Sequence, residues 1–326
     1  MARLSTRLTE RLGIAHPILS APMALAGGGA LAAAVTQAGG LGLVGGGYGD
    51  SRWLAAQAQA AGNARTGCGF ITWSLARQPH LLGEALARRP AALMLSFGDP
   101  RPFAAEIAAA EVPLICQCQS LADVRVALEA GAAIIVAQGG EAGGHGHRRA
   151  TFPFVPEVAD LLARESPETL LLAAGGVGDG RGLAAALALG ADGVLVGTRF
   201  WASREALVHA RHHQAALDAT GDQTVRSSVP DIARRLAWPA PFDIRTADNA
   251  FIARWRGRED DLRAVIAVES AAYAAAFAAG DPEEAAVIFG EAAGLVHDIP
   301  PAGELVERMV AEAVACLQSA AARIVD

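Results

Sequence analysis

The sequence predicts an α/β fold built on a (β/α)8 TIM barrel with a C-terminal, mostly helical lid, and three observations carry this prediction. Short apolar runs alternate with Ala-rich helical patterns through the first two thirds of the 326-residue chain. The runs are continuously apolar, as strands buried on both faces are. Eight such units follow one another, and eight strand–helix repeats favour a closed barrel over an open doubly wound sheet.

The predicted elements follow from these patterns in chain order. The strands are short runs of apolar or small residues at 18–21, 42–44, 67–71, 92–95, 113–116, 133–137, 170–173 and 193–196. Helical patterns lie between them at 29–38, 52–61, 79–88, 102–110, 121–130, 156–164 and 180–189. Beyond about residue 210 the alternation stops, and 260–279, 282–289 and 301–324 are predicted to be amphipathic helices.

This change of pattern predicts three parts of the chain. We expect the barrel at 1–212, a lid or small substrate subdomain at 213–280, and helices that pack back on the barrel at 281–326. The stretch 219–255 mixes Pro, Arg, Asp and Trp and shows no clear strand–helix alternation. His209, His212 and His213 lie in an Arg-containing helical run, which predicts an exposed helix face.

Composition narrows the functional class. A hydrophobic fraction of 52% and a charged fraction of 19% indicate a globular chain whose buried core is large enough for an enzyme. The net charge of −7 argues against nucleic-acid binding, which needs a cationic surface. We expect a cytoplasmic protein without a membrane partner, because the start lacks an apolar signal core and no apolar run reaches membrane-spanning length. Cys116 and Cys118 lack the second cysteine pair that would complete a metal site.

The strongest chemical signal is the Gly-rich segment 138–146, which directly follows the predicted strand 133–137. Catalytic groups of a barrel lie at the C-terminal ends of its strands. His145 is flanked by glycines that cannot pack it as a core residue, and an imidazole exchanges a proton near neutral pH. We therefore expect His145 to act as a general base or acid. A metal pair with His147 is the alternative, and Glu141 is expected to anchor the loop.

Two further Gly-rich loops, at 173–180 and 196–200, follow the seventh and eighth predicted strands. In this fold these loops commonly hold a phosphate group. The backbone N–H groups expected to face it are those of Gly175, Gly176, Gly197 and Thr198. The hydroxyl of Thr198 or the guanidinium of Arg199 would add contacts. The alternative is that these glycines serve tight turns alone. The match of 40–45 to a dinucleotide fingerprint is rejected, because its residues lie inside a strand.

Five motifs occur in an order that resembles the nitronate monooxygenase family, formerly called 2-nitropropane dioxygenases. They are HPI…APM at 16–23, AGGLG at 38–42, QGGEAGGH at 138–145, AGGVGDGR at 174–181 and GTRF at 197–200. Each motif alone is weak, whereas the combination is specific. The resemblance covers about residues 10–255 and continues weakly through Trp238-Pro239.

The resemblance implies an FMN-dependent TIM barrel that oxidises alkyl nitronates or nitroalkanes with O2 to carbonyl compounds and nitrite. His145 matches the catalytic histidine of the family, which deprotonates a neutral nitroalkane. The positions that the resemblance places around FMN are Ala21, Pro22 and Met23 for the ring, Ala174, Gly175, Gly176, Gly197 and Thr198 for the phosphate, and Gln117, Gln138, Gly143 and Gly144 near the flavin. Many members have Asn in the third strand; here Gly69 stands there, so a flavin contact must come from its backbone or from Phe70.

Two other functions remain open at this point. An NAD(P)H-dependent flavin reductase for a quinone or an enoyl thioester shares the Gly-Gly-His loop, but tends to have an acidic residue where Gln138 stands. A phosphosugar lyase or isomerase without flavin is disfavoured, because no Lys stands at a predicted strand end. The expected partners are a small-molecule substrate and O2, and a homodimer is left open.

Overall fold

The computed structural model of the chain describes residues 3–325 and confirms the predicted barrel. Within these residues, eight parallel strands close in the order β1-β2-β3-β4-β5-β6-β8-β9. They are β1 (Ile18–Ser20), β2 (Leu41–Gly45), β3 (Gly67–Ile71), β4 (Leu93–Ser96), β5 (Leu114–Cys118), β6 (Ile134–Gln138), β8 (Leu170–Ala174) and β9 (Gly193–Val196). Each strand lies within two residues of its predicted bounds.

Alternation along these strands builds an inner and an outer apolar layer. Successive side chains point to opposite faces of a strand. Leu19, Met94 and Ile115 therefore join the cluster that fills the barrel interior. Their neighbours along the chain belong to the cluster that contains the surrounding helices, as Leu95 does. Both layers exclude water, which is why the strands read as continuous apolar runs in the sequence.

Helices surround the barrel and largely match the predicted patterns. They are α2 (Gly29–Gln37), α3 (Ser51–Ala61), α5 (His80–Leu86), α6 (Arg101–Ala109), α7 (Leu121–Glu129), α8 (Thr151–Glu165) and α9 (Gly180–Ala188), with short additions at α1 (Arg7–Leu12), α4 (Thr72–Leu75) and α10 (Thr198–Trp201). The predicted start of α8 at residue 156 is wrong by five residues. Pro156 lies inside the helix, which begins at Thr151, where the Glu141 carboxylate accepts the otherwise unpaired backbone N–H.

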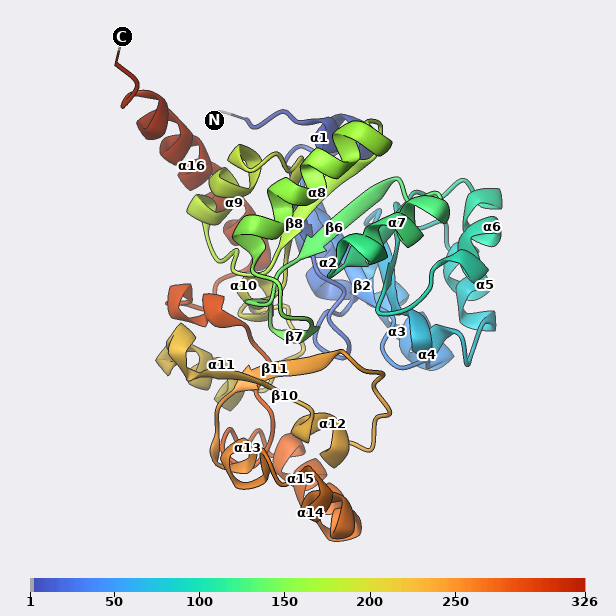
Figure 1. Ribbon diagram of the computed structural model, residues 1–326, viewed down its shortest axis with the longest axis vertical. Coiled ribbons are helices and arrows are strands. Elements are labelled where there is room, and N and C mark those ends of the chain that lie inside the picture. Colours follow the sequence, from blue (N-terminus) through green and yellow to red (C-terminus); the bar gives the residue numbers. More distant parts are fainter. Residues whose placement is uncertain (1–2, 326) are drawn as a thin grey trace.

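The segment 213–280, which we call the lid, contains strands that the sequence did not predict. After α11 (Ala210–Asp218) and η1 (Gly221–Gln223), β10 (Thr224–Ser227) pairs antiparallel with β11 (Asp243–Ala247). The other edge of β11 pairs with β7 (Gly144–Gly146), a strand that follows β6. Helices α12 (Val229–Ala233), α13 (Ala250–Trp255), α14 (Glu259–Ala264) and α15 (Ile266–Ala278) complete the lid, so the predicted helix 260–279 is broken at Val265. Figure 1 shows this sheet between the barrel and the lid helices.

The predicted helix 282–289 is wrong. This segment runs without regular secondary structure, because its carbonyl groups bond to other parts of the chain. The Asn249 side-chain amide donates to the carbonyl oxygens of Pro282 and Ala285. The carbonyl of Val287 accepts from the backbone N–H of Ala247 in β11. These bonds replace the ones that a helix would make within itself.

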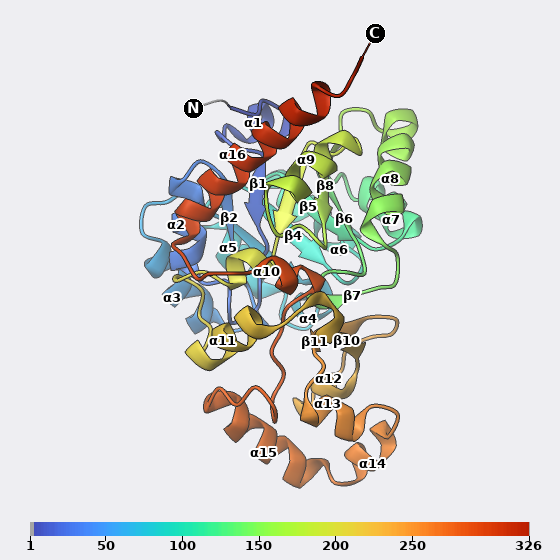
Figure 2. The same cartoon turned by 90° about the vertical axis from the view of Figure 1, so that its left-hand side faces the viewer.

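The last helix, α16 (Ala302–Ala321), follows η2 (Glu291–Leu295) and packs against α9 and α2. Gly180 allows this contact, because a Cβ atom there would lie 2.4 Å from the carbonyl oxygen of Met309. Figure 2 shows α16 running along the outside of the barrel, with both chain ends opposite the lid. Among residues 3–325, no helix is both long enough and apolar enough to cross a membrane. The division at 212 and 280 stays a prediction.

Candidate active site

A cavity of about 320 Å³ lies where the barrel strands end and the lid begins. Its volume is in the range of small-molecule pockets. The barrel contributes the ends of several strands, among them Ser96 of β4 and Gln117 of β5. The lid contributes Arg234, Trp238 and Phe277. Apart from Arg199, the residues that the sequence places at the site line this one cavity: Ala21, Pro22, Met23, Gly69, Phe70, Gln117, Gln138, Gly143, Gly144, His145, Ala174, Gly175, Gly176, Gly197 and Thr198.

His145 lies in β7, is 8% exposed and is held by an ion pair of the lid, Asp231 with Arg234. Its Nε2 lies 2.8 Å from Oδ2 of Asp231, and the other oxygen of that carboxylate accepts from Arg234 at 2.6 Å. The Asp231 carboxylate is an acceptor, so Nε2 carries the proton and Nδ1 keeps its lone pair. Burial lowers the pKa of His145 to about 4, against the hydrogen bond and charge of Asp231, which raise it. The imidazole is therefore neutral at neutral pH and can accept a proton.

Aromatic side chains cover the His145 end of the cavity. The Trp238 ring stacks on the imidazole, with ring centroids 3.3 Å apart and planes at 9°. The Trp238 indole N–H donates to the Tyr48 hydroxyl at 3.2 Å, and Phe97 meets Trp238 edge-on at 5.1 Å. These rings come from three separate parts of the chain. They shield the imidazole from water, which strengthens the electrostatic contact between His145 and Asp231.

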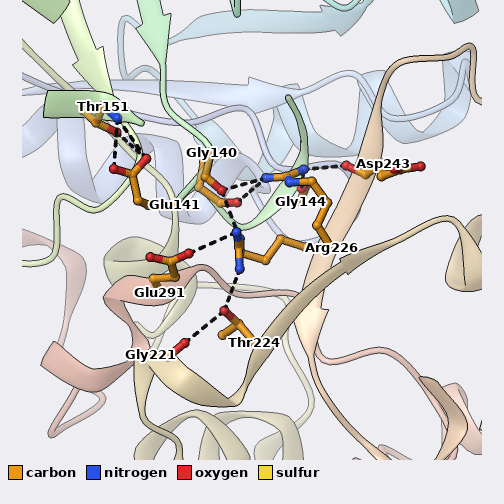
Figure 3. A network of polar contacts seen from close by, with 11 residues as sticks. Gly140, Glu141, Gly144, Thr151, Gly221, Thr224, Arg226, Asp243 and Glu291 are labelled. Carbon is orange, nitrogen blue, oxygen red and sulfur yellow. Dashed lines mark hydrogen bonds and ion pairs between the residues drawn. The ribbon is translucent and has the colours of Figure 1, made fainter. Parts of the chain in front are cut away.

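The loop that leads from β6 to His145 is held by two half-buried arginines of the lid sheet. Arg226 donates to the carbonyl oxygens of Gly140 and Ala142 with one nitrogen and to that of Gly144 with the other (Figure 3). Arg245 also donates to the carbonyl of Gly140, at 3.0 Å. Burial and the neighbouring Arg245 lower the pKa of Arg226 to about 10. Because peptide carbonyls do not titrate, this attachment persists wherever Arg226 stays protonated.

Glu141 anchors the other side of this loop, as expected. Its carboxylate accepts from the backbone N–H and from the hydroxyl of Thr151, at 2.9 and 2.8 Å (Figure 3). The Gln138 amide also serves the loop. Its nitrogen donates to the carbonyl of His145 at 3.1 Å, and its oxygen accepts from Gln119 at 2.8 Å. Gln117 differs, because its side-chain amide makes no hydrogen bond within residues 3–325 and lines the cavity.

The two Gly-rich loops form a cavity wall made of backbone. Gly175 and Gly176 have φ of +96° and +76°, a conformation that other residues rarely adopt. A Cβ atom at Gly176 or Gly197 would meet its nearest neighbour only at 3.7 or 3.8 Å, so there is room beside both. The Thr198 hydroxyl accepts from the backbone N–H of Gly290 at 2.9 Å, which leaves its own hydrogen free to donate. This wall fits a group that needs close approach to backbone, such as a phosphate.

Three sequence-based expectations need correction or refinement here. Arg199 is wrong as a phosphate contact, because it is 4% exposed and donates to the backbone and side chain of Asp298, away from the cavity. Gly69 and Gly143 line the cavity but also permit packing of the chain. A Cβ at Gly69 would lie 2.4 Å from the Pro22 ring, and one at Gly143 would lie 2.5 Å from the backbone of Gly290.

The expected exposed face of α11 is also wrong for His212. Its side chain is buried beside Phe277 at the end of α15, with ring centroids 5.6 Å apart. Its Nε2 is buried and has no hydrogen-bond partner in the described part of the chain. His209 and His212 both line the cavity. The polar residues around these histidines predict a solvent-exposed helix face, whereas Phe277 of α15, from far along the chain, packs against His212.

Sequence reasoning missed Asp231, Arg234 and the aromatic cover. Asp231 lies 86 residues from His145, and the contact depends on the pairing of β7 with β11. In the sequence Trp238 stands out only as part of a Trp-Pro pair, which does not indicate its position on the imidazole. The signal that could have found the pair is a short Asp-x-x-Arg spacing on a helix, which is too common to identify a site.

Comparisons with known proteins agree with this geometry. The family model described as "Nitronate monooxygenase" matches residues 81–312. The chain is 33% identical to a nitronate monooxygenase of Neurospora crassa, across 91% of this chain and 88% of that protein. Its fold is similar to FabK from Thermotoga maritima, with a TM-score of 0.86 and 28% identity over 98% of this chain and all of that one. It is also similar to nitroalkane oxidase from Streptomyces ansochromogenes, with a TM-score of 0.77 and 25% identity over 93% and 97% of the two chains.

Proposed function

The chain belongs to the nitronate monooxygenase family, and on that premise we propose that it is an FMN-dependent oxidoreductase that oxidises alkyl nitronates or nitroalkanes with O2 to carbonyl compounds and nitrite. The observation that carries the proposal is a neutral, buried His145 held by Asp231 in the same cavity as a wall of glycine backbone. One end of the cavity can accept a proton, and the other can hold a phosphate group.

The residues that would hold FMN come from the barrel. The backbone of Gly175, Gly176 and Gly197 and the hydroxyl of Thr198 fit the phosphate, and the segment 21–23 with the free amide of Gln117 fits the ring. When bound, a flavin supplies the redox chemistry, by taking electrons from the substrate and giving them to O2. No lysine lies in this wall, so it would hold a phosphate through hydrogen bonds rather than through a positive side chain.

His145 supplies the acid–base chemistry of the chain itself. Its Nδ1 accepts the proton from the substrate carbon next to the nitro group, and the ring becomes positively charged. Asp231 stabilises that charge through Nε2, and Arg234 fixes the carboxylate in place. A nitronate has already lost this proton, so it needs the cavity but not the base. Trp238 and Phe97 keep water away from the reacting carbon.

The test is anaerobic reduction of the purified, flavin-loaded protein. We expect the flavin absorbance to bleach with an alkyl nitronate and to stay unchanged with NADH. Rapid bleaching by NADH, together with inertness to nitronates, would instead support the NAD(P)H-dependent reductase. A colourless protein that cannot be loaded with flavin would overturn the assignment of the cofactor.

Substitution of Gly176 by Asp is expected to eject FMN. The residue has φ of +76° and faces open cavity, so a carboxylate there would meet the phosphate and repel its charge. Flavin content should fall by about tenfold or more, measured as the absorbance ratio of flavin to protein. Gly190→Asp is the matched control, because Gly190 has a similar φ of +93° but is exposed outside the cavity. Stoichiometric flavin in the Gly176 variant would refute the phosphate site.

The pH dependence follows from the burial of His145. A base works in its unprotonated form, which exists above its pKa. Since burial lowers the pKa of His145 to about 4, kcat/KM for a neutral nitroalkane should stay constant through the region near pH 6.5, where a free imidazole titrates. The rate should fall only as the pH approaches about 4. A decline centred near 6.5 in steady-state kinetics would contradict a buried base.

A further inference from the structure

The side chain of Tyr48 reaches the His145 end of the cavity from the barrel. Tyr48 lies in the Gly-rich segment 45–50 between β2 and α3, is half-buried and lines the cavity. Trp238 connects it to His145. The Trp238 indole stacks on the imidazole, with ring centroids 3.3 Å apart, and donates its N–H to the Tyr48 hydroxyl at 3.2 Å. The hydroxyl of Tyr48 and the imidazole of His145 therefore lie at the same end of the cavity.

The loop around Tyr48 is held in place by side chains from outside it. The backbone carbonyl of Tyr48 accepts from the hydroxyl of Ser74 at 3.0 Å and from the side-chain amide of Gln78 at 3.2 Å. Gly49 makes the second bond possible, because its φ is +96° and a Cβ atom there would lie 2.0 Å from the amide nitrogen of Gln78. A side chain fixed in this way can bind a ligand at little further cost in conformational entropy.

The Tyr48 hydroxyl can donate a hydrogen bond to a ligand. A phenol has one hydrogen to donate and an oxygen that accepts. The oxygen accepts from the indole of Trp238, whereas the hydrogen has no acceptor within residues 3–325. Burial raises the pKa of Tyr48, and the nearby charge of Arg234 opposes this only in part. The hydroxyl therefore keeps its hydrogen at neutral pH.

The charges at this end of the cavity favour an anion. Arg234 is the only Lys, Arg, Asp or Glu that lines the cavity in the described part of the chain. Its partner Asp231, at 2.6 Å, is not part of the lining. A negatively charged group beside Tyr48 would therefore meet a hydroxyl donor and a guanidinium, and no carboxylate would face it.

Proton transfer to His145 creates such a negatively charged group. When the bond between the α-carbon and its hydrogen breaks, the proton goes to Nδ1 of His145 and the electron pair forms a C=N bond. The two nitro oxygens then carry the negative charge. A hydrogen-bond donor already placed for these oxygens lowers the barrier, because the charge grows as the reaction proceeds.

We infer that Tyr48 binds the nitro group of the substrate, by donating its hydroxyl hydrogen to a nitro oxygen and stabilising the negative charge that forms there. This inference rests on the proposed function, because it concerns the substrate of the same cavity. The substrate then lies with its α-carbon toward His145 and its nitro group toward Tyr48 and Arg234. A preformed nitronate carries the charge from the start, so Tyr48 serves both forms of the substrate, whereas His145 serves only the neutral one.

The experiment uses inorganic nitrate, an unreactive planar anion whose oxygens resemble those of a nitronate. The flavin-loaded protein is titrated calorimetrically with nitrate, and kcat/KM is measured for a neutral nitroalkane and for its nitronate. In Tyr48→Phe we expect the dissociation constant of nitrate to rise by about tenfold or more. We expect kcat/KM to fall by about tenfold to a hundredfold with both substrate forms. The phenyl ring keeps the contacts with Trp73 and Trp238, so the variant should fold.

Tyr273→Phe is the matched control, because Tyr273 is the other tyrosine of the chain and does not line the cavity. It should bind nitrate as the unaltered protein does. The inference is overturned if the unaltered protein binds no nitrate, if Tyr48→Phe binds it equally well, or if both variants lose the same affinity. A loss of kcat/KM confined to the neutral nitroalkane would overturn it too. If no nitronate is turned over but only Tyr48→Phe loses nitrate binding, the proposed function fails and the anion site at Tyr48 stands.

Discussion

Replacing His145 by Ala is expected to lower kcat/KM for a neutral nitroalkane by about a hundredfold or more, the usual contribution of a general base. The variant keeps the cavity and its glycine wall but loses the imidazole that is proposed to accept the proton. Turnover of a preformed nitronate should change little, because its carbon is already deprotonated. Nitrite release and O2 consumption with the two forms of one substrate measure the difference.

Two comparisons make the His145 result specific. Flavin content should be unchanged, since His145 makes no part of the glycine wall. His147→Ala is the matched control, because His147 is two residues away in the same segment and does not line the cavity. An unchanged rate with the neutral nitroalkane would remove His145 from the mechanism. Equal losses with both substrate forms would assign it to binding rather than to proton transfer.

Replacing Asp231 by Asn should lower kcat/KM for a neutral nitroalkane by about tenfold to a hundredfold, because the imidazolium that forms on proton transfer loses its buried counter-charge. The carboxylate raises the pKa of His145 against the effect of burial, so its loss should weaken the base further. The pH at which activity declines should therefore move lower still. Preformed nitronates should again be oxidised at nearly the rate of the unaltered protein.

The Asp231 variant also leaves Arg234 without its buried partner, which by itself costs about 3–5 kcal/mol of stability. Thermal unfolding identifies that loss, and the double variant Asp231→Asn with Arg234→Met removes the unpaired charge. Asp243→Asn is the control, because it changes a carboxylate in the neighbouring strand β11 that does not line the cavity. If the double variant regains stability and full activity on neutral nitroalkanes, Asp231 has no part in proton transfer.

The barrel was predictable from sequence because each strand carries its own signal. Burial on both faces makes runs such as 67–71 and 193–196 continuously apolar, and both were predicted at the bounds of β3 and β9. The lid gave no such signal. Strands β7, β10 and β11 are short, and the pairing of β7 with β11 joins residues about a hundred positions apart, so no local pattern predicts it. The local pattern of segment 282–289 predicts a helix, but in the structure the side chain of Asn249 bonds two of its carbonyl groups instead.

In the candidate site, too, the residues from the barrel were predictable from the sequence and those from the lid were not. In a parallel barrel the C-terminal ends of all strands lie at one end of the barrel, so a barrel topology predicts that Met23, Gln138 and Thr198 lie close together. Arg199 follows Thr198 directly, yet it turns to Asp298, because the short helix α10 sends successive side chains in different directions. Asp231 and Trp238 approach from the lid, and their positions depend on tertiary packing that a single sequence does not encode locally.

The side chain proposed as the general base is held in place mainly by the lid rather than by the barrel. His145 sits in β7, whose hydrogen-bonded neighbour is β11 of the lid, and its Nε2 is tied to Asp231 of α12. Arg226 of β10 fastens the same loop from above. Any movement of the lid away from the eight barrel strands would therefore displace the imidazole. The position of the proposed base therefore depends on contact between the lid and the barrel.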